Sequence, residues 1–310
     1  MAQQITKYIC SECGHVTTTK TGKCPSCNSW GTFEILPEVS SSNKNSSAKK
    51  NLPNIKIINA LEVKTPRRIS TGIEEFDRVL GGGLVPGSVI LIGGQPGIGK
   101  STLLLQAAGS VAKNYNVPVL YISGEESDAQ VALRASRINT ASENLFLYSG
   151  SELEDALINL ENNNFAFFVL DSVQAMSADN NSGWVGTVTQ VRAVAQRVID
   201  TAREKKIPAV MIGHITKDGK IAGPMMLEHM VDTVLNFSGE GYSAYRMLRA
   251  VKNRYGSTDE LGIFEMLEDG LKPVTDKSGL YWNREDSAVP GVAMTIALEG
   301  NTPLAAEIQT

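Results

Sequence analysis

A glycine-rich stretch in the first third of the chain, GGQPGIGKST, has the residue types and spacing of a phosphate-binding loop. Small residues let backbone N–H groups surround a phosphate, while a lysine and a hydroxyl at the start of the next helix reach outer phosphate oxygens and a magnesium ion. The apolar stretch SVILIGG supplies the preceding strand that this motif requires. We predict that ATP binds here and that Ser101 holds Mg²⁺, with Thr102 either lining the adenosine side or capping the helix. The residues expected to contact the nucleotide are Gly94, Gln95, Pro96, Gly97, Ile98, Gly99, Lys100, Ser101 and Thr102.

Three further apolar stretches end in polar side chains suited to ATP hydrolysis. In FAFFVLDS the apolar run ends at Asp171, which we expect to hold Mg²⁺ through water, the alternative being an ordinary turn residue. YISGEES places Glu125 and Glu126 where a base could orient the attacking water. In VMIGHIT the apolar strand ends at His214, which either senses the γ-phosphate or is a satisfied histidine at a strand end.

A pair of cations, Lys252 and Arg254, lies much later, in AVKNRYGSTDE. Side chains alternate along a strand, so the K-x-R spacing puts both cations on one face. Such a pair can stabilise charge on a γ-phosphoryl group bound by a neighbouring subunit. The other interpretations are contact with DNA phosphates and a simple solvated face.

All four cysteines fall near the start, as Cys10-x2-Cys13 and Cys24-x2-Cys27. Two such pairs can surround one tetrahedral Zn²⁺, and so short a segment has too small a core to fold without it. We predict a structural zinc site with these four ligands. His15 could compete as a ligand, but four thiolates already complete the site, so we expect it to be an exposed bystander.

Composition is that of an ordinary globular chain. Of its 310 residues, 42% are hydrophobic and 20% are charged. No apolar run approaches the ~18 residues of a membrane span, and the start, MAQQITKYIC, does not resemble a secretory signal. We therefore expect a cytoplasmic protein that does not bind a membrane. The net charge of −4 argues against a uniformly basic surface but permits a local basic channel, so it decides nothing about DNA.

The composition also changes along the chain and indicates separate segments. We predict a zinc-binding knuckle at 1–36, a flexible linker rich in Ser, Asn and Lys at 37–54, an ATPase domain at 55–275, and a C-terminal segment at 276–310. In the ATPase domain, apolar strands alternate with helices and are followed by three strands joined by turns. This pattern predicts an α/β fold around a mainly parallel sheet finished by antiparallel strands.

Together these motifs resemble the bacterial RadA (Sms) family of DNA repair and recombination ATPases. The resemblance covers nearly the whole chain and rests on GKCPSC, RISTGIEEFDRVLGGGLVPGS, GGQPGIGKSTLLLQ, YISGEES, LDSVQ, GHITKDG and KNRYG. The last motif usually has phenylalanine at Tyr255. The family normally continues into a Lon-protease-like domain that helps hexamers to assemble and bind DNA, and we expect this chain to lack it, as a truncated or natural short form.

The resemblance implies a RecA-like P-loop core in a homo-oligomer, a hexameric ring, with ATP between subunits. It favours Glu125 as the catalytic base, with Glu126 as the alternate, and gives Lys252 and Arg254 a catalytic role on the neighbour's ATP. The implied activity is a DNA-stimulated, helicase-like ATP hydrolase that drives branch migration on single-stranded and branched DNA. Recombinase or replication proteins are the implied partners.

Two loops, VQAMSADNNSGWVGTVTQVR and TKDGKIAGPMMLEH, correspond to the DNA-contacting loops of RecA-like domains. Their candidate contacts are Trp184, Arg192, Lys217 and Lys220, with loop packing or subunit contacts as the alternative. A different class of function is a regulatory ATPase similar to the KaiC type, which acts on protein partners without DNA. A protease is disfavoured because the Lon-like domain is expected to be absent.

Overall fold

A computed structural model describes residues 8–19, 21–35, 67–178, 184–214, 226–239, 244–275 and 292–309. The chain divides into two compact units, Met1–Thr65 and Pro66–Thr310, which are described separately. The linker predicted at 37–54 lies outside the described residues.

The N-terminal unit contains a small antiparallel sheet in the order β2-β1-β3. Its strands are β1 (Tyr8–Cys10), β2 (Val16–Thr17) and β3 (Phe33–Ile35). The buried core of this unit consists of Cys10, Cys24 and Phe33. So few apolar residues cannot stabilise a fold unaided, which agrees with a unit that needs a metal.

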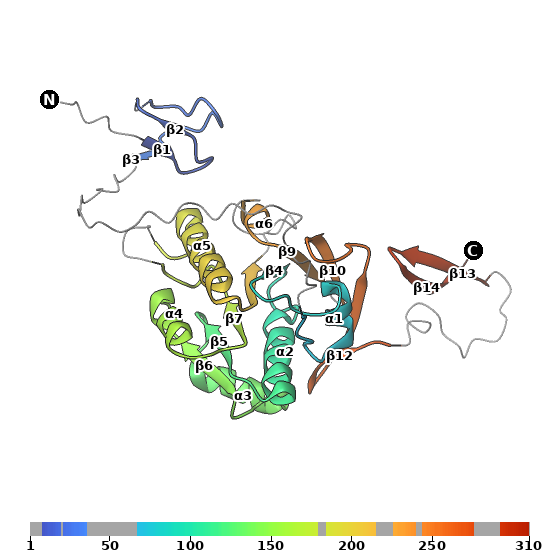
Figure 1. Ribbon diagram of the computed structural model, residues 1–310. Coiled ribbons are helices and arrows are strands. Elements are labelled where there is room, and N and C mark those ends of the chain that lie inside the picture. Colours follow the sequence, from blue (N-terminus) through green and yellow to red (C-terminus); the bar gives the residue numbers. More distant parts are fainter. Residues whose placement is uncertain are drawn as a thin grey trace, which may run out of the picture. The chain divides into compact units, whose positions relative to one another are not determined.

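The second unit is built on a nine-stranded sheet with the strand order β12-β11-β10-β9-β4-β8-β7-β5-β6 (Figure 1). Its strands are β4 (Val89–Gly94), β5 (Val119–Ser123), β6 (Leu145–Ser149), β7 (Phe167–Asp171), β8 (Ala209–His214), β9 (Thr233–Ser238), β10 (Tyr245–Asn253), β11 (Leu261–Leu267) and β12 (Gly270–Pro273). Strands β4 to β9 pair in parallel, and β9 to β12 pair antiparallel. The predicted parallel sheet with an antiparallel end is confirmed.

Helices cover both faces of this sheet, because its central strands are apolar on both sides. Ile90 and Ile92 of β4 pack into a core with α1, α2 and α3. Val89 and Leu91 of the same strand pack into a second core with α4 and α5, which lie together in Figure 1. The helices are α1 (Glu74–Leu80), α2 (Lys100–Tyr115), α3 (Asp128–Arg137), α4 (Leu153–Asn162), α5 (Val188–Lys205) and α6 (Met226–Met230).

The carboxyl ends of four parallel strands meet at one edge of the sheet. In the register of the sheet, Gly94 of β4 pairs with His214 of β8, and Ser123 of β5 pairs with Asp171 of β7. This edge is where open α/β sheets bind ligands. It brings together the phosphate loop and the segments that carry the predicted acidic residues.

Several elements were not predicted. The short helix α6 lies in a stretch expected to be a loop, and the C-terminal segment forms a hairpin of β13 (Val292–Glu299) and β14 (Thr302–Gln309). The hairpin turn packs against the connection between β10 and β11, where Asn301 donates a backbone hydrogen bond of 3.0 Å to the carbonyl of Asp259. Among the described residues, no helix has the length and apolar character of a membrane span.

Candidate active site

The phosphate loop joins the end of β4 to the first residue of α2. Gly99, immediately before α2, has φ +112°, and Gly97 has φ +75°, both in the region that favours glycine. A Cβ on Gly99 would also lie 2.5 Å from Met266 Cε of β11. The loop therefore needs glycine here for its backbone direction and for its packing against the sheet.

Lys100 is buried at the centre of this loop. Its Nζ donates hydrogen bonds to the carbonyls of Gly94, at 2.8 Å, and Gln95, at 2.9 Å. Burial lowers the pKa of Lys100, whereas the charges of Asp171 and Glu125 raise it. The ammonium is thus held within the loop and near two carboxylates, where it can bind phosphate oxygens.

Asp171, at the end of β7, is 8% exposed and accepts hydrogen bonds from two hydroxyls. Tyr121 Oη of β5 donates to Asp171 Oδ2 at 2.6 Å, and Ser101 of α2 is the second donor. Burial raises the pKa of Asp171, and the two hydrogen bonds oppose that shift. Ser101 and Asp171 together offer a hydroxyl and a carboxylate oxygen, a donor set that suits Mg²⁺.

The two adjacent glutamates have different partners. Glu125 Oε1 accepts a hydrogen bond of 2.5 Å from Ser172, the residue after Asp171. Glu126 instead forms an ion pair with Arg134 of α3. Glu125 is therefore oriented toward the end of β7, and the Glu126 carboxylate is held against α3.

Lys252 and Arg254 lie at the opposite end of β4 from the phosphate loop of the same chain. Arg254 Nη1 donates to Asp232 Oδ1 at 3.3 Å, and Asp232 Oδ2 accepts the backbone N–H of Val89, the first residue of β4, at 3.0 Å. Val89 and Gly94 are separated by about 17 Å at the strand rise of about 3.3 Å per residue. The cation pair is thus far from the nucleotide site of its own chain.

The expectation that Lys252 and Arg254 share one face of a regular strand was wrong. A register shift between Ala250 and Lys252 interrupts the pairing of β10 with β9, and β10 ends before Arg254. The period-two argument therefore does not apply. Both cations still face one segment, because Lys252 Nζ donates to the carbonyls of Glu228 and Val231, at 2.7 and 2.8 Å, next to Asp232.

Two polar side chains fasten the turn after β10 to the end of α1. Arg68 donates to the carbonyls of Leu80 and Gly83 and, at 2.5 Å, to that of Tyr255. Asn253 Nδ2 donates to the Leu80 carbonyl at 3.4 Å. Arg68 and Asp232 were not predicted to have a role, although both lie in polar positions beside apolar stretches. Tyr121, the one side chain of β5 that combines an aromatic ring with a hydroxyl, was not predicted either.

The four cysteines of the N-terminal unit form a compact cluster. All four Sγ atoms lie within 4.8 Å of one another, with Cys10 and Cys27 at 3.7 Å and Cys13 and Cys24 at 3.6 Å. Tetrahedral Zn–S bonds of about 2.3 Å place sulfur atoms about 3.8 Å apart, so the cluster fits zinc. A hydrogen bond from Thr32 lowers the pKa of the Cys10 thiol to about 6, whereas the pKa of the neighbouring Cys13 thiol is raised to about 11, so it is the spacing of the sulfur atoms that supports the metal site. His15, half-buried, is not part of the group.

The remaining predicted residues are only partly described. Trp184 is 86% exposed, and Arg192 on α5 is exposed as well. Lys217 and Lys220 lie outside the described residues, as does the side chain of His214.

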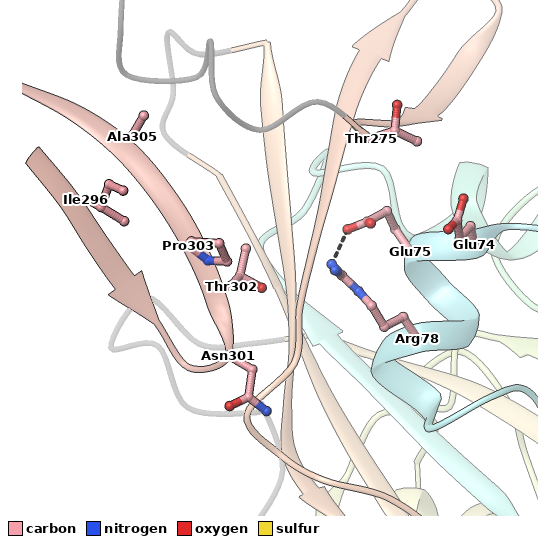
Figure 2. Close-up of a pocket in the computed structure, with 9 residues that line it drawn as sticks. All are labelled: Glu74, Glu75, Arg78, Thr275, Ile296, Asn301, Thr302, Pro303 and Ala305. Atoms are coloured by element: carbon pink, nitrogen blue, oxygen red, sulfur yellow. Dashed lines mark hydrogen bonds and ion pairs between the residues drawn. The ribbon is translucent and has the colours of Figure 1, made fainter. Parts of the chain in front are cut away.

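A separate cavity of about 510 Å³ lies between α1 and the C-terminal hairpin (Figure 2). Within it, Arg78 forms an ion pair of 2.5 Å with Glu75, which also accepts the backbone N–H of Ile263 at 2.9 Å. These contacts tie α1 to β11. No residue of the phosphate loop lines this cavity, and its charged groups serve the packing of α1.

Comparisons with known proteins agree with this geometry. Residues 69–147 match the family model for the KaiC ATPase, and residues 8–34 match that for a rubredoxin metal binding domain. A KaiC-like protein from Pyrococcus horikoshii OT3 is similar in structure, with a TM-score of 0.57 and 18% identity over 68% of this chain and 100% of that one. The RadB recombinase gives a TM-score of 0.51 and 22% identity over 66% and 99%. Fold and site together define a P-loop ATPase of the KaiC and RecA type with a zinc-binding knuckle.

Relatives with higher sequence identity show the family to which the chain belongs. DNA repair protein RadA of Bacillus subtilis is 42% identical, and that of Streptococcus pyogenes serotype M6 is 41% identical; each match covers 100% of this chain and 68% of the relative. The protein of that name from Aquifex aeolicus is 43% identical with the same coverage. The chain belongs to the DNA repair protein RadA family.

Proposed function

We propose that this chain is a DNA-stimulated ATP hydrolase of recombinational DNA repair, which drives branch migration by moving on single-stranded DNA as an oligomeric ring. Membership of the RadA family supports the repair role. The position of Lys252 and Arg254, at the opposite end of β4 from the phosphate loop, is the observation that carries the proposal. If the pair acts on ATP, that ATP belongs to a second copy of the chain.

Each hydrolytic site then draws on two subunits. Lys100 and the loop N–H groups bind the β- and γ-phosphates, and Ser101 and Asp171 would hold Mg²⁺, which neutralises charge on the phosphate oxygens when bound. Glu125 orients the water that attacks the γ-phosphorus. Lys252 and Arg254 of the neighbouring copy stabilise the charge that develops on the γ-phosphoryl oxygens.

A mixing experiment tests the shared site directly. K100A removes the phosphate-binding lysine, and R254A removes the cation from the neighbour, so each variant alone should hydrolyse little ATP. In a 1:1 mixture, some interfaces combine the intact phosphate loop of R254A with the intact Arg254 of K100A. In a ring of head-to-tail contacts, random mixing forms such an interface about one time in four, so it should restore about a quarter of the wild-type rate. Inactivity of the mixture at the concentration where the wild-type is active would refute a shared site.

Single-stranded DNA added to the wild-type chain separates the repair motor from a regulatory ATPase of the KaiC type. Stimulation of hydrolysis that is lost in both variants supports the motor. The match of residues 69–147 to the KaiC family keeps the second function as the alternative outcome. It would be favoured by a rate that DNA leaves unchanged in an assembled oligomer.

A further inference from the structure

The nucleotide site has two sides, and the acidic groups that the structure describes there, Asp171 and Glu125, lie on one of them. Asp171 ends β7 and Glu125 follows β5, and both strands lie on the β8 side of the phosphate loop. Hydrolysis needs the γ-phosphate near these groups. An extended nucleotide whose γ-phosphate points toward β7 must direct its nucleoside toward the other neighbour of β4, which is β9, followed by β10.

Arg246 lies on this other side, at the same end of the sheet as the phosphate loop. Gly94 pairs with Phe237 of β9, and Phe237 pairs with Leu248 of β10. Arg246 is two residues beyond Leu248 in the direction of that end, and so it shares the Leu248 face of β10. Leu248 belongs to the core that α2 covers. Arg246 thus points to the face on which α2 begins.

The Arg246 side chain also leans toward the loop. A Cβ built on Gly239 would lie 2.7 Å from Arg246 Cδ and 3.1 Å from Cδ1 of Ile98. Arg246 therefore packs over Gly239 beside a residue of the phosphate loop. Its guanidinium is fixed further by a hydrogen bond of 2.9 Å from Nη1 to the Tyr245 carbonyl. Two strand spacings, about 10 Å, separate β10 from β4, which an arginine side chain and a nucleoside can span together.

We propose that Arg246 contacts the nucleoside end of the ATP bound by its own chain, with its guanidinium against the base or the ribose. A planar guanidinium can stack on an aromatic ring and donate hydrogen bonds within its plane, which an ammonium cannot do. This role differs from that of Arg254, which lies at the far end of the sheet. It depends only on nucleotide binding and is independent of assembly and DNA.

The test compares ATP with inorganic tripolyphosphate, which has the phosphates without the nucleoside. R246A and R246K should each weaken ATP binding about 5- to 30-fold, because the contact uses the planar group, and should leave tripolyphosphate binding unchanged. The unchanged binding of tripolyphosphate also shows that the variants are folded at the phosphate loop.

Arg249 provides a matched control. It is exposed, lies on the same strand, and is three residues from Arg246, so it points to the opposite face of β10. R249A should bind ATP as the wild-type chain does. Equal loss of ATP and tripolyphosphate in R246A would indicate a phosphate contact or local misfolding, and ATP binding unchanged in R246A would show that Arg246 makes no contact; either result overturns the proposal.

Discussion

Tyr121 Oη donates a hydrogen bond of 2.6 Å to Asp171 Oδ2, so a fully buried tyrosine of β5 supports the acidic residue at the end of β7. Burial and the neighbouring carboxylate raise the pKa of Tyr121 well above its usual value of 10.0. The phenol therefore keeps its proton and acts as a donor throughout the neutral range. The hydrogen bond from this phenol favours the ionised form of Asp171, which Mg²⁺ requires.

Replacing Tyr121 by phenylalanine should make ATP hydrolysis more sensitive to acid. Burial already raises the pKa of Asp171, and the hydrogen bond from Tyr121 lowers it. Loss of that bond raises the pKa further, so ionised Asp171 disappears at a higher pH as the solution is acidified. A hydrogen bond to a charged group contributes about 1.5–3 kcal/mol, so the displacement of the acid limb should be measurable.

The measurement is the pH profile of Mg²⁺-dependent hydrolysis for wild-type and Y121F. Y148F is a matched control, because Tyr148 Oη donates to the carbonyl of Glu152, away from the phosphate loop. Its profile should coincide with that of the wild-type. An acid limb in Y121F that stays in place, or moves to lower pH, would contradict a role for Tyr121 at Asp171.

The substitutions E125Q and E126Q should have different effects on the rate of ATP hydrolysis. Glu125 is hydrogen-bonded to Ser172 at the nucleotide site, so its loss should reduce kcat about 10²–10⁴-fold and leave ATP binding intact. Glu126 is paired with Arg134, so E126Q should change kcat only a few-fold. Hydrolysis rates together with ATP titrations distinguish the two. A larger loss of kcat in E126Q than in E125Q would reverse the assignment.

This pair also shows what the sequence can predict. The phosphate loop and the strand before Asp171 were predicted correctly because each is a local pattern of neighbouring residues. The partners of Glu125 and Glu126 are Ser172, which follows β7, and Arg134, which lies on α3. Adjacent residues of the same type cannot be told apart until those elements are placed.

The geometry of the cation pair and the C-terminal hairpin were not predicted, for related reasons. A bulge in β10 and the contact of Arg254 with Asp232 are properties of strand pairing, which the period-two rule does not include. Strands β13 and β14 lie in the stretch predicted only as a C-terminal segment, for which no strand pairing was expected. The sequence thus predicted the elements that carry these residues better than the contacts that the residues make.

The zinc knuckle should be separable from nucleotide binding. Cys24 is completely buried in the cysteine cluster, so C24S should lose zinc and unfold the N-terminal unit. The nucleotide site consists of residues of the second unit, so the affinity for ATP should be unchanged. Zinc content and ATP titrations of the same preparations check this. Retained zinc in C24S, or a parallel loss of ATP binding, would refute the separation, and H15A should retain zinc because His15 is outside the cluster.

Arg68 should control hydrolysis from a distance by holding the turn that carries Arg254. Its guanidinium joins the end of α1 to the Tyr255 carbonyl, so R68A frees the turn without touching the phosphate loop. We expect kcat to fall about 10-fold, as for loss of one or two hydrogen bonds to a charged donor, with ATP binding unchanged. Arg67, which is exposed, offers the control variant R67A, whose rate should match the wild-type.

Mixing R68A with K100A or with R254A shows whether Arg68 acts through the turn that carries Arg254 or through the nucleotide site of its own chain. If the defect of R68A lies in the turn, a 1:1 mixture with K100A should regain activity, because R68A supplies an intact phosphate loop and K100A supplies an intact turn. The same defect should not be rescued by mixing with R254A, since both variants then lack a functional turn. Rescue by R254A and not by K100A would place the effect of Arg68 in the nucleotide site of its own chain and remove its link to Arg254.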